Sequence, residues 1–231
     1  MPPETVWLNT TDYTPFELIL FGLGCFGWVV SYVAILRRVQ KNKFLEIPAG
    51  AVVANVAWEF LWGFTFTTSM GMVFAWGYRI WFFLDLFIVY MLFKYGWKQA
   101  DIPAIARSFN AASAFGIACW LVALYYFIRG GYDTSYGAIS GYILNVMMSA
   151  LYLVLIAKQS NNPQYFSEVV AWSKMLGTAL LSVFNFMVRP DDYLLMTLYV
   201  ATLVLDVAYI VAVRTLSGRA VPARIAPATI G

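Results

Sequence analysis

Three acidic residues stand in the chain where all their neighbours are apolar. Glu59 lies in the stretch NVAWEFLWGF, and residues 47–78 around it contain no other charged residue. Asp85 and Asp206 lie in the comparable stretches RIWFFLDLFIVY and LYVATLVLDVAYIV. A carboxyl group in apolar surroundings is therefore expected to be paired, hydrogen bonded or protonated. Where two such groups lie close together away from water, at least one keeps its proton at neutral pH and can act as a general acid.

The composition indicates that these stretches cross a membrane. Of the 231 residues, 61% are hydrophobic and 12% are charged, against about 25% charged in soluble proteins. The uncharged runs are about as long as the roughly 20-residue helix that crosses the hydrocarbon layer, and they do not alternate like the strands of a membrane β-barrel. We therefore expect an all-α integral membrane protein, a seven-helix bundle with spans at about 16–36, 47–69, 73–93, 108–128, 134–157, 168–188 and 193–213.

The distribution of basic residues predicts the orientation of this bundle. Lysine and arginine concentrate after the first, third, fifth and seventh predicted spans. By the positive-inside rule the N-terminus is then outside and the C-terminus in the cytosol. We expect one transmembrane domain over residues 1–216 and a loose cytosolic tail over residues 217–231. The basic residues lie at the ends of the predicted spans and are not gathered on one face. The net charge of +3 therefore gives no reason to expect a nucleic-acid partner.

The residue types exclude most metal and cofactor sites. The chain has no histidine and two cysteines, Cys25 and Cys119, so we expect neither a zinc nor a haem site. Both cysteines fall inside predicted spans and are expected to pack as small apolar residues, not to form a disulfide. The paired Asp191 and Asp192 lack the third acid of a magnesium-binding aspartate-rich motif and are predicted to form a solvated turn after Pro190. The prediction is that no metal and no organic cofactor binds.

Aromatic and amide side chains accompany the three acids at helical spacing. Aromatic faces attract cations and can stabilise a carbocation without reacting with it. The predicted depths allow the three carboxylates to share one cavity, and no buried base is expected to neutralise them. The residues that spacing places beside them are Asn55, Trp62, Phe66, Tyr78, Trp81, Tyr199, Thr202 and Tyr209.

Two of these stretches resemble a known family, the small seven-span terpene cyclases of fungal meroterpenoid and indole-diterpene pathways and their bacterial relatives. The second span of that family carries a Trp-Glu pair in an Asn-x-x-Trp-Glu-like stretch, here NVAWEF with Asn55, Trp58 and Glu59. Its last span carries an aspartate in a Leu-Asp-hydrophobic-hydrophobic-Tyr-like stretch, here LDVAYI with Asp206 and Tyr209. The third predicted span, RIWFFLDLFIVY, is also similar to the family.

The resemblance implies an activity and a site. Glu59 and Asp206 would form the acid centre, with Asp85 and Trp58 in supporting positions. Such acids protonate the terminal epoxide of a prenyl chain, the polyene closes its rings, and a final proton loss ends the cascade. The implied partners are a hydrophobic prenylated substrate and the lipid bilayer, without an obligatory protein partner. The implied compartment is the endoplasmic reticulum for a fungal chain and the cytoplasmic membrane for a bacterial one.

Other classes of membrane protein make different demands on these residues. A microbial rhodopsin is excluded because residues 193–213 contain no lysine to bind retinal. A proton-coupled transporter, using the membrane carboxylates as a relay, is the main alternative. A scaffold in which the acids only join helices is a further alternative. Product formation separates them, since only a cyclase converts a lipid substrate in isolated membranes.

Overall fold

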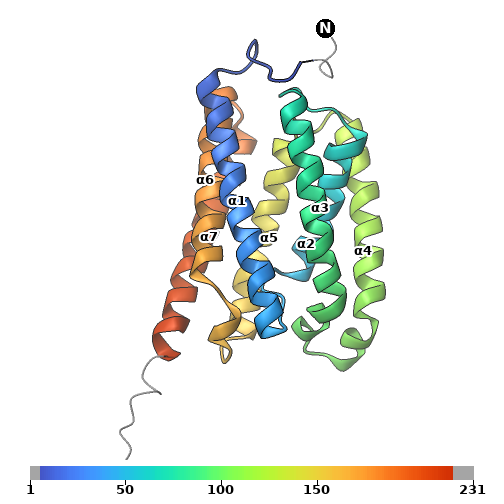
Figure 1. Ribbon diagram of the computed structural model, residues 1–231, viewed down its shortest axis with the longest axis vertical. Coiled ribbons are helices and arrows are strands. Elements are labelled where there is room, and N and C mark those ends of the chain that lie inside the picture. The colour runs from blue at the N-terminus through green and yellow to red at the C-terminus, as the bar shows by residue number, and fades with distance from the viewer. Residues whose placement is uncertain (1–5, 221–231) are drawn as a thin grey trace, which may run out of the picture.

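The computed structural model describes residues 6–220, and every regular element in that part of the chain is a helix (Figure 1). The long helices are α1 (Pro15–Asn42), α2 (Ala49–Phe60), α3 (Met72–Tyr95), α4 (Pro103–Arg129), α5 (Ala138–Lys158), α6 (Glu168–Val188) and α7 (Tyr193–Ala220). A π-helix η2 (Leu61–Thr65) continues α2, and two 3-10 turns, η3 (Gly96–Gln99) and η4 (Pro163–Tyr165), lie between longer helices. The predicted all-α class is confirmed for the described residues.

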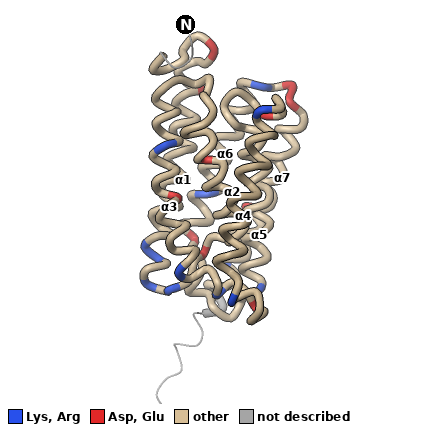
Figure 2. Tube along the Cα trace, turned by 90° about the vertical axis from the view of Figure 1, so that its right-hand side faces the viewer, with Lys and Arg blue, Asp and Glu red and all other residues tan. Residues whose placement is uncertain are grey.

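Six helices of the described chain are long and apolar enough to cross a membrane: α1, α3, α4, α5, α6 and α7. The chain is thus a multi-pass membrane protein. Figure 2 shows lysine and arginine mostly at the two ends of the bundle, with more at the end where α1 finishes. Six of the seven predicted spans therefore correspond to helices with the length and composition of a membrane span. The predicted second span does not.

The predicted second span differs most from the structure. An α-helix was expected over residues 47–69, but α2 has 12 residues and ends at Phe60. There the chain widens into the π-helix, in which the N–H of Phe66 donates to the carbonyl of Leu61 at 2.8 Å, five residues back. Such a π segment rotates the side chains that follow it away from the face an α-helix would give them.

The last helix is longer than predicted. A span ending at residue 213 and a tail from residue 217 were expected, whereas α7 continues to Ala220. Ser217 is therefore still helical, and the remainder of the predicted tail, residues 221–231, lies outside the described residues.

Helix α2 occupies the middle of the bundle. It packs against α3, α4 and α5, while α1 packs along α6, and α7 packs along α5 and α6. In Figure 1 the pair α1 and α6 stands on one side and the pair α3 and α4 on the other. The acidic residue of α2, Glu59, is consequently surrounded by helices.

Small residues allow α1 and α6 to approach closely. A Cβ atom added at Gly27 would lie 2.9 Å from the Cα of Gly177, and one at Gly177 would lie 2.8 Å from the carbonyl oxygen of Gly24. One turn further along, the hydroxyls of Ser31 and Ser173 are hydrogen bonded at 2.7 Å. Close backbone contact between small residues is a main source of helix association in lipid, so this contact fixes α6 against α1.

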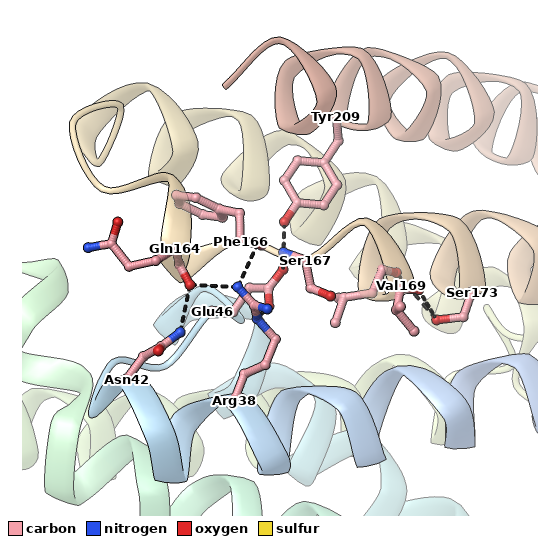
Figure 3. Close-up of polar contacts among 10 residues, drawn as sticks. Arg38, Asn42, Glu46, Gln164, Phe166, Ser167, Val169, Ser173 and Tyr209 are labelled. Atoms are coloured by element: carbon pink, nitrogen blue, oxygen red, sulfur yellow. Dashed lines mark hydrogen bonds and ion pairs between the residues drawn. The ribbon is translucent and has the colours of Figure 1, made fainter. Parts of the chain in front are cut away.

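A buried glutamate ties three elements together at the end of the bundle where α1 finishes (Figure 3). Glu46, 1% exposed, lies in the connection between α1 and α2. Its Oε1 accepts hydrogen bonds from the backbone N–H of Ser167 at 2.8 Å and the hydroxyl of Tyr209 at 3.1 Å. Arg38 Nε lies 3.7 Å from Oε2 of Glu46, and the same guanidinium donates to the carbonyl of Gln164 at 2.5 Å. Glu46 thereby fixes the start of α2 relative to α6 and α7.

Burial raises the pKa of Glu46 from its ordinary value of 4.5 to about 7. The hydrogen bond from Ser167, the charge of Arg38 and the hydrogen bond from Tyr209 act in the opposite direction and only partly offset the burial. Because the folded-state pKa lies above the unfolded one, the folded protein binds this proton more tightly. Stability should therefore fall as the pH rises from about 4.5 through about 7 and then level off.

Replacing Glu46 by glutamine should remove this pH dependence. The glutamine carbonyl can accept the same hydrogen bonds from Ser167 and Tyr209 but does not titrate. A change from 4.5 to about 7 corresponds to about 3 kcal/mol of unfolding free energy. Unfolding of the purified protein in detergent, followed between pH 4.5 and 8, should show wild type losing stability relative to Glu46→Gln. Glu168→Gln controls for the lost negative charge, and parallel curves for wild type and Glu46→Gln would contradict the assignment.

Candidate active site

A cavity of about 110 Å³ lies inside the bundle between α1, α2, α3, α5 and α6. Its walls are mostly aromatic and apolar, and Glu59 is the one charged residue among the described residues that line it. Five of the aromatic residues in this wall come from α1, α2 and α3: Trp28, Tyr32, Trp58, Tyr78 and Trp81. The cavity is thus apolar except for a few polar side chains, and Glu59 brings a carboxyl group to its wall.

The Glu59 carboxyl is buried and only lightly hydrogen bonded. Its side chain is 5% exposed, and Oε1 accepts one long hydrogen bond, 3.5 Å, from the hydroxyl of Tyr32. Oε2 has no hydrogen-bond partner among the described residues. One carboxyl oxygen of this cavity-lining residue is therefore buried without a partner in the described chain.

Asp85 of α3 lies beside Glu59. Its carboxyl group is 1% exposed, and it is close to both the Glu59 carboxyl and the Tyr32 hydroxyl. Neither oxygen of Asp85 makes a hydrogen bond of ordinary geometry, and neither acid forms an ion pair within residues 6–220. Two neighbouring carboxyl groups without a cation cannot both ionise in a low-dielectric interior. The pair accordingly shares at least one proton.

Asp206 lies elsewhere. Lys174 of α6 forms a buried ion pair with Oδ1 of Asp206, and the Ser149 hydroxyl donates to the same oxygen at 2.7 Å. The side chains of Lys174 and Asp206 are 1% and 2% exposed. Asp206 lines a groove between α6 and α7, and it is not among the residues that line the Glu59 cavity. The structure does not bring Asp206 and Glu59 into one cavity.

The expectation that no buried base accompanies the acids is wrong. Lys174 falls within the predicted sixth span, residues 168–188; it lies nearly two turns into α6 and is 1% exposed. Its ammonium group neutralises Asp206, so that of the three acids within the apolar stretches only Glu59 and Asp85 have no ion pair in the described chain.

The remaining predicted residues fall into two groups. Asn55, Trp58 and Trp81 line the cavity together with Glu59. Trp62 does not line it, and its ring lies beside Gly137 at the N-terminus of α5. Tyr209 is also absent from the lining and bonds to Glu46 at the end of the bundle instead.

Sequence reasoning missed Tyr32, Glu46 and Lys174. Tyr32 contacts Glu59 from α1, but a tyrosine in an apolar span carries no motif. Lys174 carried a usable signal, since a lysine within a predicted span must find a partner or reach the surface. Glu46 lies just outside an expected span, where a glutamate is normally solvated.

The aromatic side chains around the acid pair hold one another in edge-on contacts. The ring centroids of Trp58 and Tyr78 are 5.4 Å apart and those of Tyr32 and Trp81 are 6.3 Å apart. Trp28 differs, because the ammonium group of Lys174 lies 5.6 Å from the centre of its ring. A ring that already faces a cation is a poor stabiliser of a second one, so Trp58, Tyr78 and Trp81 are the better candidates.

Known proteins are similar to this chain in sequence. The family model of Pyr4-like transmembrane terpene cyclases matches residues 8–217. A Pyr4-family terpene cyclase, mfmH of Annulohypoxylon moriforme, is 27% identical over 198 residues, which are 79% of this chain and 78% of that protein. Terpene cyclase dpasB of Apiospora sacchari is 24% identical over 64% of this chain and 59% of its own length.

A third relative, terpene cyclase macJ of Penicillium terrestre, is 23% identical over 65% of this chain and 59% of its own length. No solved structure matches the chain. Because the family model covers nearly the whole described bundle, including the acid pair and its cavity, the chain belongs to the Pyr4-like transmembrane terpene cyclases.

Proposed function

We propose that this cyclase starts its reaction by proton transfer from Glu59 to the terminal epoxide of a prenyl chain. The observation that carries the proposal is the pair of buried carboxyl groups, Glu59 and Asp85, which has no cation in the described chain and of which Glu59 lines an aromatic cavity. A protonated acid in a dry pocket is a strong donor to a weakly basic oxygen. Asp85 is positioned to share the proton of Glu59 before the substrate arrives.

The proposed steps balance without a further reactant. Glu59 gives its proton to the epoxide oxygen, a carbon–oxygen bond breaks, and the oxygen becomes a hydroxyl. The electron pair of each alkene then attacks the cationic carbon before it, which closes the rings. Loss of a proton from the last cation forms an alkene, and a carboxylate of the acid pair takes up that proton, so the donor is restored.

The cavity wall supports the cationic intermediates. Trp58, Tyr78 and Trp81 line it, and their faces can stabilise a positive charge by about 0.5–2 kcal/mol each. The Tyr32 hydroxyl, 3.5 Å from Oε1 of Glu59, can strengthen its hydrogen bond to the carboxylate that forms after proton transfer. The hydrophobic prenylated substrate would enter from the bilayer, and no metal or organic cofactor has a part in these steps.

A proton-coupled transporter is not favoured as the alternative, since the matched family and the similar proteins are named as cyclases. The meroterpenoid class of the substrate is part of the proposal, and it is tested by feeding epoxidised prenyl-phenols to membranes that contain the protein.

The proposed orientation counts α2 with η2 as a seventh crossing. Together they cover Ala49–Thr65, which is at the short end of the roughly 17–25 residues that span a bilayer. Seven crossings place the N-terminus outside and the basic ends of α1, α3 and α5 in the cytosol, as the positive-inside rule requires. Reporter fusions after Lys43, Gln99 and Gln159 should report cytosol, and fusions at Gly71, Gly131 and Asp191 should report the outside. A cytosolic reporter at Gly71 would remove α2 as a crossing.

For Asp206 the geometry supports a positioning role. Its ion pair holds Lys174, whose ammonium group lies behind the Trp28 ring of the cavity wall. Asp206→Asn should leave Lys174 buried and unpaired, which costs about 3–5 kcal/mol of stability. The double variant Asp206→Asn/Lys174→Met should regain most of the folded protein and turnover, as measured by thermal unfolding in detergent and product formation. A folded but inactive double variant would return Asp206 to the acid centre.

Glu59→Gln should lose about 10²- to 10⁴-fold in turnover, because it keeps size and polarity but cannot donate a carboxylic-acid proton. Asp85→Asn should lose less, and Glu59→Gln/Asp85→Asn should be little worse than Glu59→Gln alone, as is usual for residues that act as one unit. Product from an epoxidised prenyl-phenol is measured by mass spectrometry, with Glu168→Gln as control. Full turnover by well-expressed Glu59→Gln would contradict the proposal.

A further inference from the structure

The segment that leads into α5 is organised around Asp133. Its Oδ1 accepts hydrogen bonds from the backbone N–H groups of Thr134 at 2.8 Å, Ile139 at 2.9 Å and Ser140 at 3.3 Å. The N-cap residue of α5, Gly137, has no side chain to make these contacts. A carboxylate at a helix N-terminus satisfies free N–H groups and is favoured by the helix dipole. Asp133 therefore takes the place of a missing cap and is held firmly.

The other oxygen of Asp133 connects to the cavity wall. The hydroxyl of Ser140 donates to Asp133 Oδ2 and accepts from the indole Nε1 of Trp58 at 2.7 Å. An indole N–H can only donate, and a hydroxyl that gives its hydrogen to a carboxylate keeps its lone pairs for such a donor. Trp58 is consequently the donor to Ser140, and Ser140 is the donor to Asp133, so each hydrogen bond in this chain has one direction.

Two glycines form a slot for the same indole. Gly137 has a φ of +82°, and a Cβ atom there would lie 2.8 Å from Cζ2 of Trp58 and 2.7 Å from the Trp62 ring. A Cβ atom at Gly141 would lie 3.6 Å from Trp58 Cζ2, in ordinary contact. Tyr78 meets the indole edge-on, with 5.4 Å between the ring centroids. The hydrogen bond and the slot together leave the Trp58 ring one orientation.

We propose that Asp133 and Ser140 are positioning residues that fix the indole of Trp58 in the cavity wall and so select which ring-closed product forms. Trp58 directly precedes Glu59 in α2 and lines the same cavity, so its π-system meets cationic carbons that arise next to the proton donor. A tilted ring would stabilise a different carbon. The orientation of the Trp58 ring follows from the contacts alone, whereas the selection of products rests on the proposed function.

The orientation is tested by ¹⁹F NMR of protein labelled with 5-fluorotryptophan. Of the nine tryptophan signals, that of Trp58 is assigned as the one missing from Trp58→Phe. Ser140→Ala should shift or broaden this signal, Asp133→Asn should do so as a second variant, and Ser140→Thr should restore it. Ser31→Ala is the matched control, because Ser31 is a buried serine with a hydroxyl partner, Ser173, away from the cavity lining. An unchanged Trp58 signal in both Ser140→Ala and Asp133→Asn overturns the proposal.

The product ratio is measured with an epoxidised prenyl-phenol. One neutral hydrogen bond has a net effect that corresponds to about a 2- to 10-fold change in the ratio. Ser140→Ala should show this change, Ser140→Thr should not, and Trp58→Phe/Ser140→Ala should match Trp58→Phe alone. A moved Trp58 signal with an unchanged product ratio overturns the selection of products. Absence of any product from wild type overturns the proposed function and leaves the NMR result on orientation valid.

Discussion

The proposed chemistry of this protein depends on two carboxyl groups that lie side by side without a cation. Glu59 and Asp85 are both buried, and neither has an ion-pair partner in the described chain. In a bilayer such a pair is tolerated only when it shares a proton or faces a polar occupant. In the proposed function, the adjacent cavity with its aromatic walls lets this constraint serve as a proton donor to an apolar substrate. The buried Lys174 does not reach this pair, because Asp206 already neutralises it.

The fold serves this pair by putting α2 in the middle. α3 supplies Asp85, α1 supplies Tyr32, and α5 supplies the glycine slot for Trp58. The close glycine contact between α1 and α6 and the Glu46 cluster at one end of the bundle hold the outer helices around α2. The burial of both acids beside a mostly apolar cavity gives them low-dielectric surroundings, which favours the shared proton on which the proposed function depends.

Much of this could be predicted from the sequence, since the apolar runs locate the helices and a carboxylate within such a run indicates function. The positions of Asn55, Trp58, Glu59 and Trp81 on one cavity follow from helical spacing and from the resemblance. The pairing of Lys174 with Asp206 could not be predicted, because it depends on the rotation of α6 relative to α7. Trp62 shows a second limit: helical spacing from Glu59 placed it beside the acids, but it lies outside the cavity lining, and no residue type in LWGFT predicts the π-helix in which it lies.

Infrared difference spectroscopy between wild type and Glu59→Gln would test the shared proton directly. Both proteins should carry Glu46→Gln, since the pKa of Glu46 is about 7 and its own proton would otherwise contribute at neutral pH. The account predicts a carbonyl-stretch band of a protonated carboxylic acid at pH 7 that shifts in D₂O, disappears in Glu59→Gln and moves in Asp85→Asn. A spectrum in which both groups contribute only carboxylate bands at pH 7 would contradict it.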